Sequence, residues 1–341
     1  MKIIVTGGAG FLGSRVITEL LAAQDAGTLP EQITEVVSLD LAETPVQDPR
    51  VSSVVGDIAD PELLARTVDS RTWAIYHMAA VLSGGSEEDF DLSHRVNVHA
   101  THQLLEAARA TGNRPRFVFT SSIAVFGGEM PEVVPENLAP SPTPPTAPSR
   151  PSASCWSTTT PASFVDARIC RLPTISVRPG RPNSAASSFA SGIIREPLQG
   201  EPSVCPVPLE TRMWLSSPNT VVANLVHALS VDGEQIGRWR VLNLPGLCVT
   251  VGEMLESLTA VGGQQARDLV SLEEDEGIKS IVLSWPGDSR WTACWSWASA
   301  ARTASRTRSA SSTRSLSPES LRLYRRITPL SPLQCQGGHH E

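Results

Sequence analysis

A strand, a tight glycine turn and a helix start follow one another within the first thirteen residues, and this order constrains the fold most. The apolar run of residues 2–5 precedes Thr-Gly-Gly-Ala-Gly-Phe-Leu-Gly at residues 6–13. Gly7 permits the turn, Gly10 lets the backbone approach a pyrophosphate, and Gly13 lets the helix lie close to the sheet. Free N–H groups and the helix dipole favour an anion at the helix start. The segment therefore predicts a site for a dinucleotide cofactor.

Apolar stretches and helical patterns then alternate as far as residue 127. The predicted strands cover residues 2–6, 35–40, 51–55, 73–79 and 116–121, and the predicted helices cover residues 11–24, 60–70 and 92–111. Such alternation indicates a parallel sheet with helices on both faces. A further strand begins at Phe164. We therefore predict an α/β fold with a doubly wound, Rossmann-type parallel sheet over residues 1–175.

A smaller, mixed α/β substrate domain is predicted over residues 176–287. Its pattern is weaker, with helices near residues 188–196, 220–229 and 251–261 and a strand near 239–244. Helical spacing of apolar residues supports the helices. We expect the substrate to bind to this part of the chain.

Composition and charge exclude several classes of function. A formal net charge of −7 with 40% hydrophobic residues gives no general attraction to nucleic acid or to an anionic membrane. No apolar run approaches the ~18 residues of a membrane helix, and the cofactor strand at the start leaves no room for a secretory signal. The six cysteines are scattered, and the histidines lack metal-ligand spacing. We expect free thiols in a reducing cytoplasm and no metal site.

Two segments break the pattern. Residues 139–163 contain seven prolines and eleven serines or threonines, with Arg150 as the only charge. Proline at this density excludes a helix. Residues 296–317 contain eight serines, five alanines, four arginines and three threonines, a composition typical of disorder. We therefore expect residues 139–163 and a tail over 288–341 to be irregular, and no aromatic residues interleave the tail arginines as in a nucleic-acid-binding arm.

Two aspartates follow predicted strands. Asp40 closes the second strand, where a carboxylate accepts hydrogen bonds from an adenosine ribose and repels a 2′-phosphate. This favours NAD over NADP. Asp57 and Ile58 follow the third strand. Asp57 either meets the adenine edge or caps the next helix.

In combination, the motifs of the first half resemble an extended short-chain dehydrogenase/reductase of the NAD-dependent epimerase/dehydratase type. They are, in chain order, residues 6–13, Asp57-Ile58, His77-Met78-Ala79-Ala80, Asn97 and residues 120–127. The resemblance implies that NAD is bound or supported by Gly7, Gly10, Phe11, Leu12, Gly13, Asp40, Asp57, Ile58, Ala79, Ala80, Asn97 and Pro173. The resemblance also implies a homodimer formed through two helices, of which one is the helix that the proline-rich segment replaces here. Ser122 would be catalytic and hydrogen-bond the reacting oxygen, although a serine at a strand end can also cap a turn.

A narrower resemblance, in the second half, is to the subfamily of D-erythronate dehydrogenases. It rests on residues 178–198, 205–208 and 214–218. It implies NAD-dependent oxidation of a small sugar acid, D-erythronate, to its 2-oxo acid. The side chains expected to hold the substrate are those of Ser122, Arg178, Asn183, Ser187 and Arg195, because arginine grips a carboxylate through two hydrogen bonds. Each arginine could instead be a surface or ion-paired residue.

One essential part of the family pattern is missing. The family chemistry needs a Tyr-x-x-x-Lys pair on the helix after Ser122, in which positive charge lowers the pKa of the tyrosine so that it acts as a base. This chain has no tyrosine between Tyr76 and Tyr324, and no lysine between Lys2 and Lys279. The segment rich in proline stands where the pair belongs.

A shifted reading frame would account for both breaks. Codons exist for residues 146–162 that, translated one base back, give Y-G-T-Q-Q-A-V-G-E-L-L-V-N-D-Y-T-R, which looks like the missing helix with its tyrosine but without its lysine. Residues 288–299 similarly give R-F-A-V-D-G-V-L-E-L-G-F. We therefore expect an impaired enzyme. The alternatives are a nucleotide-sugar epimerase or dehydratase of the same superfamily and a non-catalytic NAD-binding protein.

Overall fold

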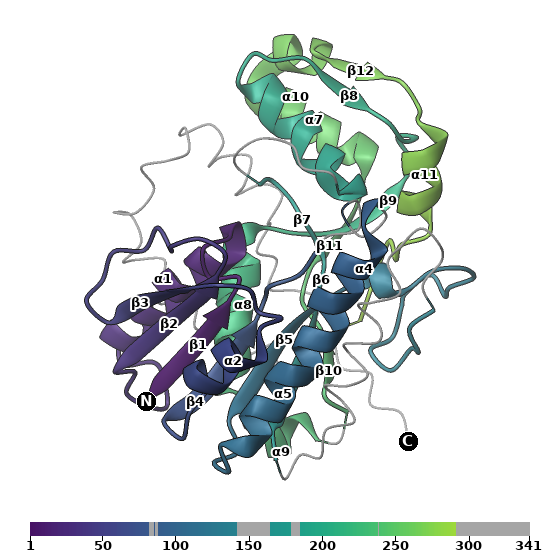
Figure 1. Ribbon diagram of the computed structural model, residues 1–341. Coiled ribbons are helices and arrows are strands. Elements are labelled where there is room, and N and C mark those ends of the chain that lie inside the picture. Colours follow the sequence, from purple (N-terminus) through teal and green to yellow (C-terminus); the bar gives the residue numbers. More distant parts are fainter. Residues whose placement is uncertain (82–84, 86–87, 142–163, 179–184, 238, 291–341) are drawn as a thin grey trace.

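A seven-stranded, wholly parallel sheet forms the centre of the protein. The computed structural model describes residues 1–81, 85, 88–141, 164–178, 185–237 and 239–290 (Figure 1). The sheet has the order β10-β6-β5-β4-β1-β2-β3. Its strands are β1 (Lys2–Thr6), β2 (Glu35–Asp40), β3 (Val51–Val55), β4 (Thr72–His77), β5 (Arg116–Ser122), β6 (Asp166–Leu172) and β10 (Val241–Asn243). The Rossmann-type sheet predicted from the sequence is confirmed.

Helices cover both faces of this sheet. On one face lie α1 (Phe11–Asp25) and α8 (Pro218–Ser230), and on the other α2 (Pro61–Thr67), α4 (Phe90–His94) and α5 (Ala100–Ala110). Successive side chains of a strand point to opposite faces. Accordingly, Ile3 and Val5 contribute to the core under α1 and α8, whereas Ile4 contributes to the core under α2 and α5. Burial on both faces explains why β1 is apolar without alternation.

The order of the strands places the site. The chain runs from β1 outward to β2 and β3, and then returns to β4 on the other side of β1. In such sheets ligands bind at the carboxyl ends of the strands, where the order reverses. The glycine turn after β1 and the residues after β4 therefore lie side by side at this edge.

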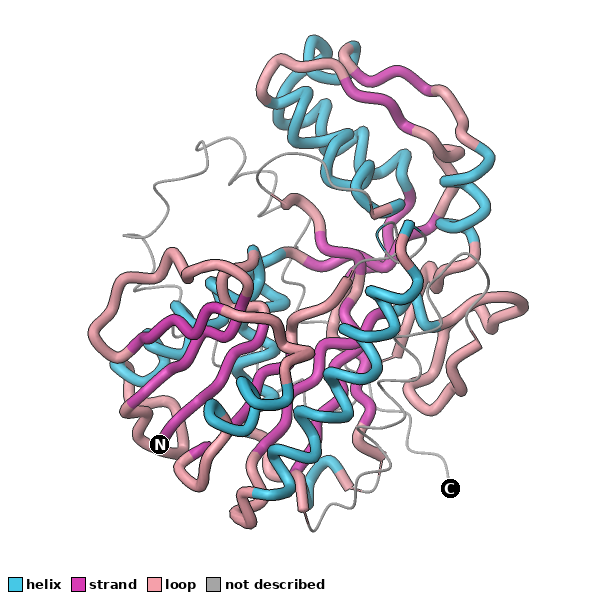
Figure 2. The backbone as a smooth tube through the Cα atoms, viewed as in Figure 1, coloured by secondary structure: helices cyan, strands magenta, loops and turns pink. Residues whose placement is uncertain are grey.

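A second, mixed α/β part lies beyond the carboxyl ends of the strands, at the top of Figure 1. It contains a three-stranded sheet of order β11-β9-β7 and a two-stranded sheet of β12 and β8. Figure 2 shows its helices beside these short strands. Its elements are β7 (Thr174–Ile175), α7 (Phe189–Leu198), β8 (Ser203–Cys205), β9 (Arg212–Ser216), β11 (Leu247–Thr250), α10 (Val251–Asp268), β12 (Val270–Leu272) and α11 (Glu276–Leu283).

The boundary between the two parts is less simple than the predicted division at residue 175. The prediction placed α8 and β10 in the substrate domain, but α8 packs on α1 and β10 extends the large sheet beside β6. A short helix, α9 (Gly233–Ile236), lies between them. The apolar residues Val221 and Leu225 of α8 belong to the same core as β1. The chain thus returns to the first part before it completes the second.

The predicted helix over residues 92–111 is interrupted. Near its start, residues Arg95–His99 form a π-helical turn between α4 and α5. π-Helical turns displace one residue of the helix and frequently occur at functional sites. Here the turn contains Asn97, one of the predicted cofactor residues, and buries it.

The predicted irregular tail begins slightly too early at residue 288. The backbone N–H of Val134 donates to the Asp288 carbonyl at 3.1 Å, and the N–H of Arg290 donates to the Val134 carbonyl at 2.9 Å. Ser289 is buried between them and accepts a hydrogen bond from Asn243. Residues 288–290 therefore belong to the folded body, and the predictions for 142–163 and 291–341 fall outside the described residues.

Candidate site for a dinucleotide and a sugar acid

The glycine turn has the shape that a dinucleotide requires. Gly7 has φ +71°, and a Cβ atom placed on it would lie 2.8 Å from the backbone nitrogen of Ala79. A Cβ atom on Gly13 would lie 2.0 Å from the Gly7 carbonyl oxygen. Gly10 begins α1, and no side chain caps the first turn of that helix. Its N–H groups therefore suit an anion, and the residues fit the pyrophosphate of a dinucleotide.

Asp40 lies beside this turn at the carboxyl end of β2. Its Oδ2 atom accepts a hydrogen bond from the N–H of Ala9 at 2.9 Å, and its Oδ1 atom accepts one from the N–H of Leu41 at 2.7 Å. These bonds fix the carboxylate against the glycine turn. A carboxylate oxygen has two acceptor positions, so each oxygen retains capacity for a ribose hydroxyl.

Asp57 does not cap a helix. The N-cap of α2 is Asp60, whose side chain accepts hydrogen bonds from the N–H groups at the helix start. Asp57 instead accepts the N–H of Ala59 at 2.8 Å and pairs with Nη1 of Arg95 at 2.5 Å. The backbone hydrogen bond from Ala59, followed by the bond from Arg95, lowers the pKa of the Asp57 carboxyl. Ile58 turns inward and joins the core under α2.

The Asp57–Arg95 pair makes a pH-dependent contribution to stability. Because the pKa of Asp57 is lowered by folding, this contribution is present above the unfolded pKa of about 3.9 and is lost as the pH falls through the folded value. We expect R95M to raise the Asp57 pKa only partly, since the bond from Ala59 remains. R95M should unfold more easily than the wild type at neutral pH, by less than about 1 kcal/mol because both side chains are partly exposed.

NMR titration of the Asp57 carboxyl in both proteins measures this shift directly. Denaturation at neutral and at strongly acidic pH measures the stability difference, which should shrink as the carboxyl becomes protonated. A difference of equal size at both extremes of pH would show that Arg95 stabilises the protein by packing alone.

The segment after β4 is held from two sides. The N–H groups of Met78 and Ala79 donate to Oγ1 of Thr6 at 3.1 and 3.2 Å. Asn97 binds the backbone of Val81 twice, accepting its N–H at 2.9 Å and donating to its carbonyl at 3.0 Å. The predicted cofactor residues Ala79 and Ala80 lie between these anchors. Ala79 is half-buried and Ala80 exposed, whereas the predicted residue Pro173 is buried after β6.

Ser122 ends β5 and does cap a turn. Its Oγ atom accepts the N–H of Ala124 at 3.1 Å, at the start of a short 3₁₀ turn over Ile123–Val125. This bond uses a lone pair of the hydroxyl and not its hydrogen. The capping role and the predicted role of donating to a substrate oxygen are therefore compatible.

The two predicted substrate arginines differ in what they contact. Arg195 is nearly buried, donates to the carbonyl of Arg178 at 2.6 Å and pairs with Glu196. Its guanidinium is therefore engaged within the protein, which was the alternative to substrate binding. The backbone N–H of Arg178 donates to Oγ of Ser191 at 3.1 Å, whereas its guanidinium forms no hydrogen bond or ion pair with the residues that the structure describes. Burial, and then the nearby charge of Arg195, lower the pKa of its guanidinium.

The other two predicted substrate residues are placed less fully. Ser187 lies in a 3₁₀ turn, Ala186–Ser188, that leads into α7. Asn183 falls outside the described residues. Arg178 and Ser187 both precede α7 in the chain, and Ser187 lies in the turn directly before it. Their position relative to Ser122 stays a prediction.

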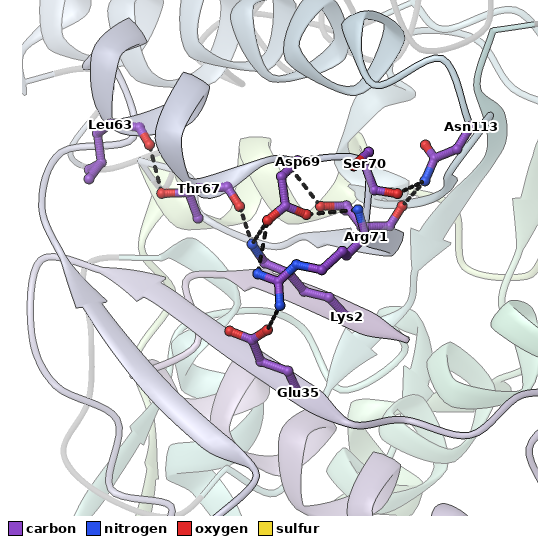
Figure 3. Close-up of polar contacts among 9 residues, drawn as sticks. Lys2, Glu35, Leu63, Thr67, Asp69, Ser70, Arg71 and Asn113 are labelled. Atoms are coloured by element: carbon purple, nitrogen blue, oxygen red, sulfur yellow. Dashed lines mark hydrogen bonds and ion pairs between the residues drawn. The ribbon is translucent and has the colours of Figure 1, made fainter.

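The tyrosine and the two lysines of the described chain all have structural partners away from Ser122. Tyr76 is fully buried in β4, and its hydroxyl donates to the Leu225 carbonyl. Lys2 begins β1 at the opposite edge of the sheet and donates to the Thr67 carbonyl and to Asp69 (Figure 3). Lys279 pairs with two glutamates around α11. Burial raises the pKa of Tyr76 well above its ordinary value, and its hydroxyl is enclosed in the core against the Leu225 carbonyl.

Comparison with known proteins decides the family. A family model described as "NAD dependent epimerase/dehydratase family" matches residues 3–215. The chain belongs to this family. D-erythronate dehydrogenase of Cupriavidus necator is 46% identical over 300 residues, which cover 86% of this chain and 91% of that protein. D-erythronate dehydrogenase of Haemophilus influenzae is 43% identical over 291 residues, covering 84% of this chain and 90% of that protein.

A solved structure gives the same result for the fold of this epimerase/dehydratase family member. The nucleoside-diphosphate-sugar epimerase from Agrobacterium tumefaciens superposes with a TM-score of 0.79 and is 35% identical. The match covers 87% of this chain and 88% of that one. The predicted family and fold are confirmed, and membership in this family supports an NAD-type cofactor.

Two kinds of feature are absent from the part of the chain that the structure describes. None of the helices in that part of the chain has the length and apolar character needed to cross a membrane. The same residues bring together no group of three or more histidine, cysteine or acidic side chains that could hold a metal ion.

Sequence reasoning missed the partners of the predicted cofactor residues. Arg95 pairs with Asp57 across 38 positions of the chain, and Thr6 binds the segment after β4 across more than 70. No local spacing reports such contacts. The one available signal was the strand order, because β1 and β4 are neighbours in this fold.

Proposed function

We propose that this protein descends from NAD-dependent sugar-acid dehydrogenases that oxidise D-erythronate to its 2-oxo acid. The observation that carries the proposal is the identity of 46% and 43% to two D-erythronate dehydrogenases, over about nine-tenths of their length. The glycine turn supports a dinucleotide, and Asp40 beside it supports NAD rather than NADP.

The residues divide the task as follows. NAD, when bound, accepts the hydride from the alcohol carbon of the substrate. The Ser122 hydroxyl donates a hydrogen bond to the substrate oxygen and orients it, while its own Oγ is held by Ala124. The guanidinium of Arg178, free of partners among the described residues, is suited to the carboxylate of a sugar acid. The hydroxyl proton of the substrate must pass to a general base.

That base is the missing part. Tyr76 is buried in the core, where its hydroxyl donates to the Leu225 carbonyl, and Lys2 donates to the Thr67 carbonyl at the amino end of β1. A general base typically contributes about 10²–10⁴ in rate. We therefore propose that the chain, as written, binds NAD but turns over sugar acids slowly or not at all.

A nucleotide-sugar epimerase is the second candidate, since a protein of that name is 35% identical. Such a substrate carries two phosphates, and its site would need more basic and aromatic groups in the second part than Arg178 and Arg195 supply. Arg195 is engaged by Glu196. This observation favours the smaller, singly charged substrate.

Titration with NAD and with NADP, followed by a turnover assay on D-erythronate, tests the proposal. We expect NAD to bind more tightly than NADP. We also expect turnover of D-erythronate to be lower than that of a family member with the Tyr-x-x-x-Lys pair, by at least the factor of about 10² that a missing base costs. The control is G13V, in which the added side chain collides with the Gly7 carbonyl; it should not bind NAD. Failure of the wild type to bind either dinucleotide, or turnover of a nucleotide sugar in place of D-erythronate, would refute the proposal.

A further inference from the structure

A series of buried, hydrogen-bonded polar groups connects the carboxyl ends of β1 and β4 to the helix that contains Asn97. Oγ1 of Thr6 lies 2.8 Å from Nδ1 of His77, and Nε2 of His77 lies 2.7 Å from Oγ1 of Thr101. The Thr101 hydroxyl also lies 2.8 Å from the carbonyl oxygen of Asn97 in the π-helical turn. All four residues are at least nine-tenths buried. Together they link β1, β4 and the helix that carries Asn97.

The Thr101 hydroxyl fixes the proton on one side of the imidazole. A hydroxyl has one hydrogen to donate, and a carbonyl can only accept. The hydrogen of Thr101 must therefore point to the Asn97 carbonyl. Its contact with Nε2 of His77 is a hydrogen bond only if that nitrogen carries a hydrogen and donates it.

The Thr6 hydroxyl leads independently to the same assignment. Its oxygen accepts two backbone N–H groups, those of Met78 and Ala79, which fill its two acceptor positions. Its hydrogen is then directed to Nδ1 of His77, which must accept. Both ends thus require a neutral imidazole with its hydrogen on Nε2.

The network surrounds the segment that meets the cofactor. Thr6 binds the N–H groups of Met78 and Ala79, and Asn97 binds the backbone of Val81. His77 connects these two contacts, directly to Thr6 and through Thr101 to Asn97. The place of a Cβ atom on Gly7 is only 2.8 Å from the Ala79 nitrogen, so a small shift of this segment moves it against the glycine turn. The imidazole itself is confined by two phenylalanine rings of β5, Phe117 and Phe119.

We propose that His77 is a positioning residue for the cofactor. As a neutral imidazole that donates from Nε2 and accepts at Nδ1, it couples the end of β1 to the π-helical turn and fixes residues 78–81 against the glycine turn. The proposal rests on the proposed function only in taking NAD as the ligand. It predicts that the hydroxyls of Thr6 and Thr101, which contact the two imidazole nitrogens, affect NAD affinity although both residues are buried.

Matched threonine variants test the coupling. T101V keeps the shape of the side chain but removes the acceptor of the Nε2 hydrogen, and we expect it to weaken NAD binding by about tenfold, as for one lost hydrogen bond. T101S retains the hydroxyl and should bind NAD like the wild type. T67V is the control for general destabilisation, since the buried Thr67 hydroxyl donates to the Leu63 carbonyl at the opposite edge of the sheet. It should unfold more easily but keep its affinity for NAD.

The hydrogen position is measured separately in the protein without NAD. Long-range ¹H–¹⁵N correlation spectra distinguish the two neutral forms of histidine, and H77Q identifies the signal by its loss. We expect a protonated Nε2 and an unprotonated Nδ1 at neutral pH, and T101V should disturb this pattern. A hydrogen on Nδ1, a doubly protonated ring, or equal losses of NAD affinity in T101V, T101S and T67V would overturn the proposal. Absence of NAD binding by the wild type refutes the proposed function instead, and the spectra still decide the network.

Discussion

Replacing residues 146–162 with Y-G-T-Q-K-A-V-G-E-L-L-V-N-D-Y-T-R is expected to raise the turnover of D-erythronate by about 10²–10⁴. The new segment supplies a tyrosine and, one helical turn later, a lysine. The lysine and the positive nicotinamide lower the pKa of the tyrosine, so that the phenolate can accept the substrate proton. Ser122 already stands at the carboxyl end of β5 with its hydroxyl hydrogen available.

Two matched segments separate chemistry from folding. The first has phenylalanine in place of the tyrosine, and the second has the glutamine of the shifted frame in place of the lysine. Both should restore the helix without restoring the base, and NAD titration and kcat on D-erythronate measure the two effects. If the phenylalanine segment raises kcat as much as the tyrosine segment, the gain comes from folding alone. If the chain as written already turns over at the restored rate, the base lies elsewhere.

The parts of the fold that follow from local pattern were predicted well. The strand of residues 2–6 and the helix that follows it were predicted because the glycine turn fixes their order and the apolar run is buried on both faces. The strands β2 and β3 were also predicted with their observed bounds, although only β2 is largely buried. Backbone sterics also made the glycines informative, since the space at Gly7 and Gly13 admits no side chain.

The parts that depend on distant partners were not predicted. A strand near residues 239–244 was predicted, and β10 lies there, but its place in the large sheet was missed, because that place is fixed by pairing with β6 across about 70 positions. The π-helical turn was predicted as ordinary helix; in the structure its Asn97 binds the backbone of Val81, 16 positions away, a contact that helical spacing does not show. Arg195 donates to the carbonyl of Arg178, 17 positions away, a contact that local pattern does not indicate, and its role toward a substrate stays a prediction. In these cases the residue type indicated which hydrogen bonds and ion pairs a side chain could form, and the packing of distant segments determined which partners it met.

Arg168 shows the same limit in the core. It lies within the predicted strand after Phe164, where its charge gave no sign that it would be buried. In the structure it is completely buried. It pairs with Asp166 at 2.9 Å and donates to the carbonyls of Ala228 and Val231 at 2.8 and 2.7 Å. These carbonyls end α8, so the cation also meets the negative end of that helix dipole.

R168M is therefore expected to lower the free energy of unfolding by about 3–5 kcal/mol. Methionine fills part of the volume but leaves Asp166 with only Arg240 and leaves buried carbonyls without their donor. Burial lowers the pKa of the Arg168 guanidinium, and the attraction of Asp166 opposes that shift. The buried cation therefore depends on its carboxylate partner, and the carboxylate depends on the cation. Urea denaturation measures the loss as a lower midpoint at an unchanged slope.

The control for R168M is R71M, at the residue directly before β4. Arg71 also forms ion pairs, with Asp69 and Glu35, but its side chain is 68% exposed (Figure 3). Exposed pairs are screened by water and contribute little, so R71M should unfold almost like the wild type. Equal losses in the two variants would mean that charge, and not burial, sets the cost. A loss below about 1 kcal/mol in R168M would mean that water reaches the vacated carbonyls and replaces the guanidinium.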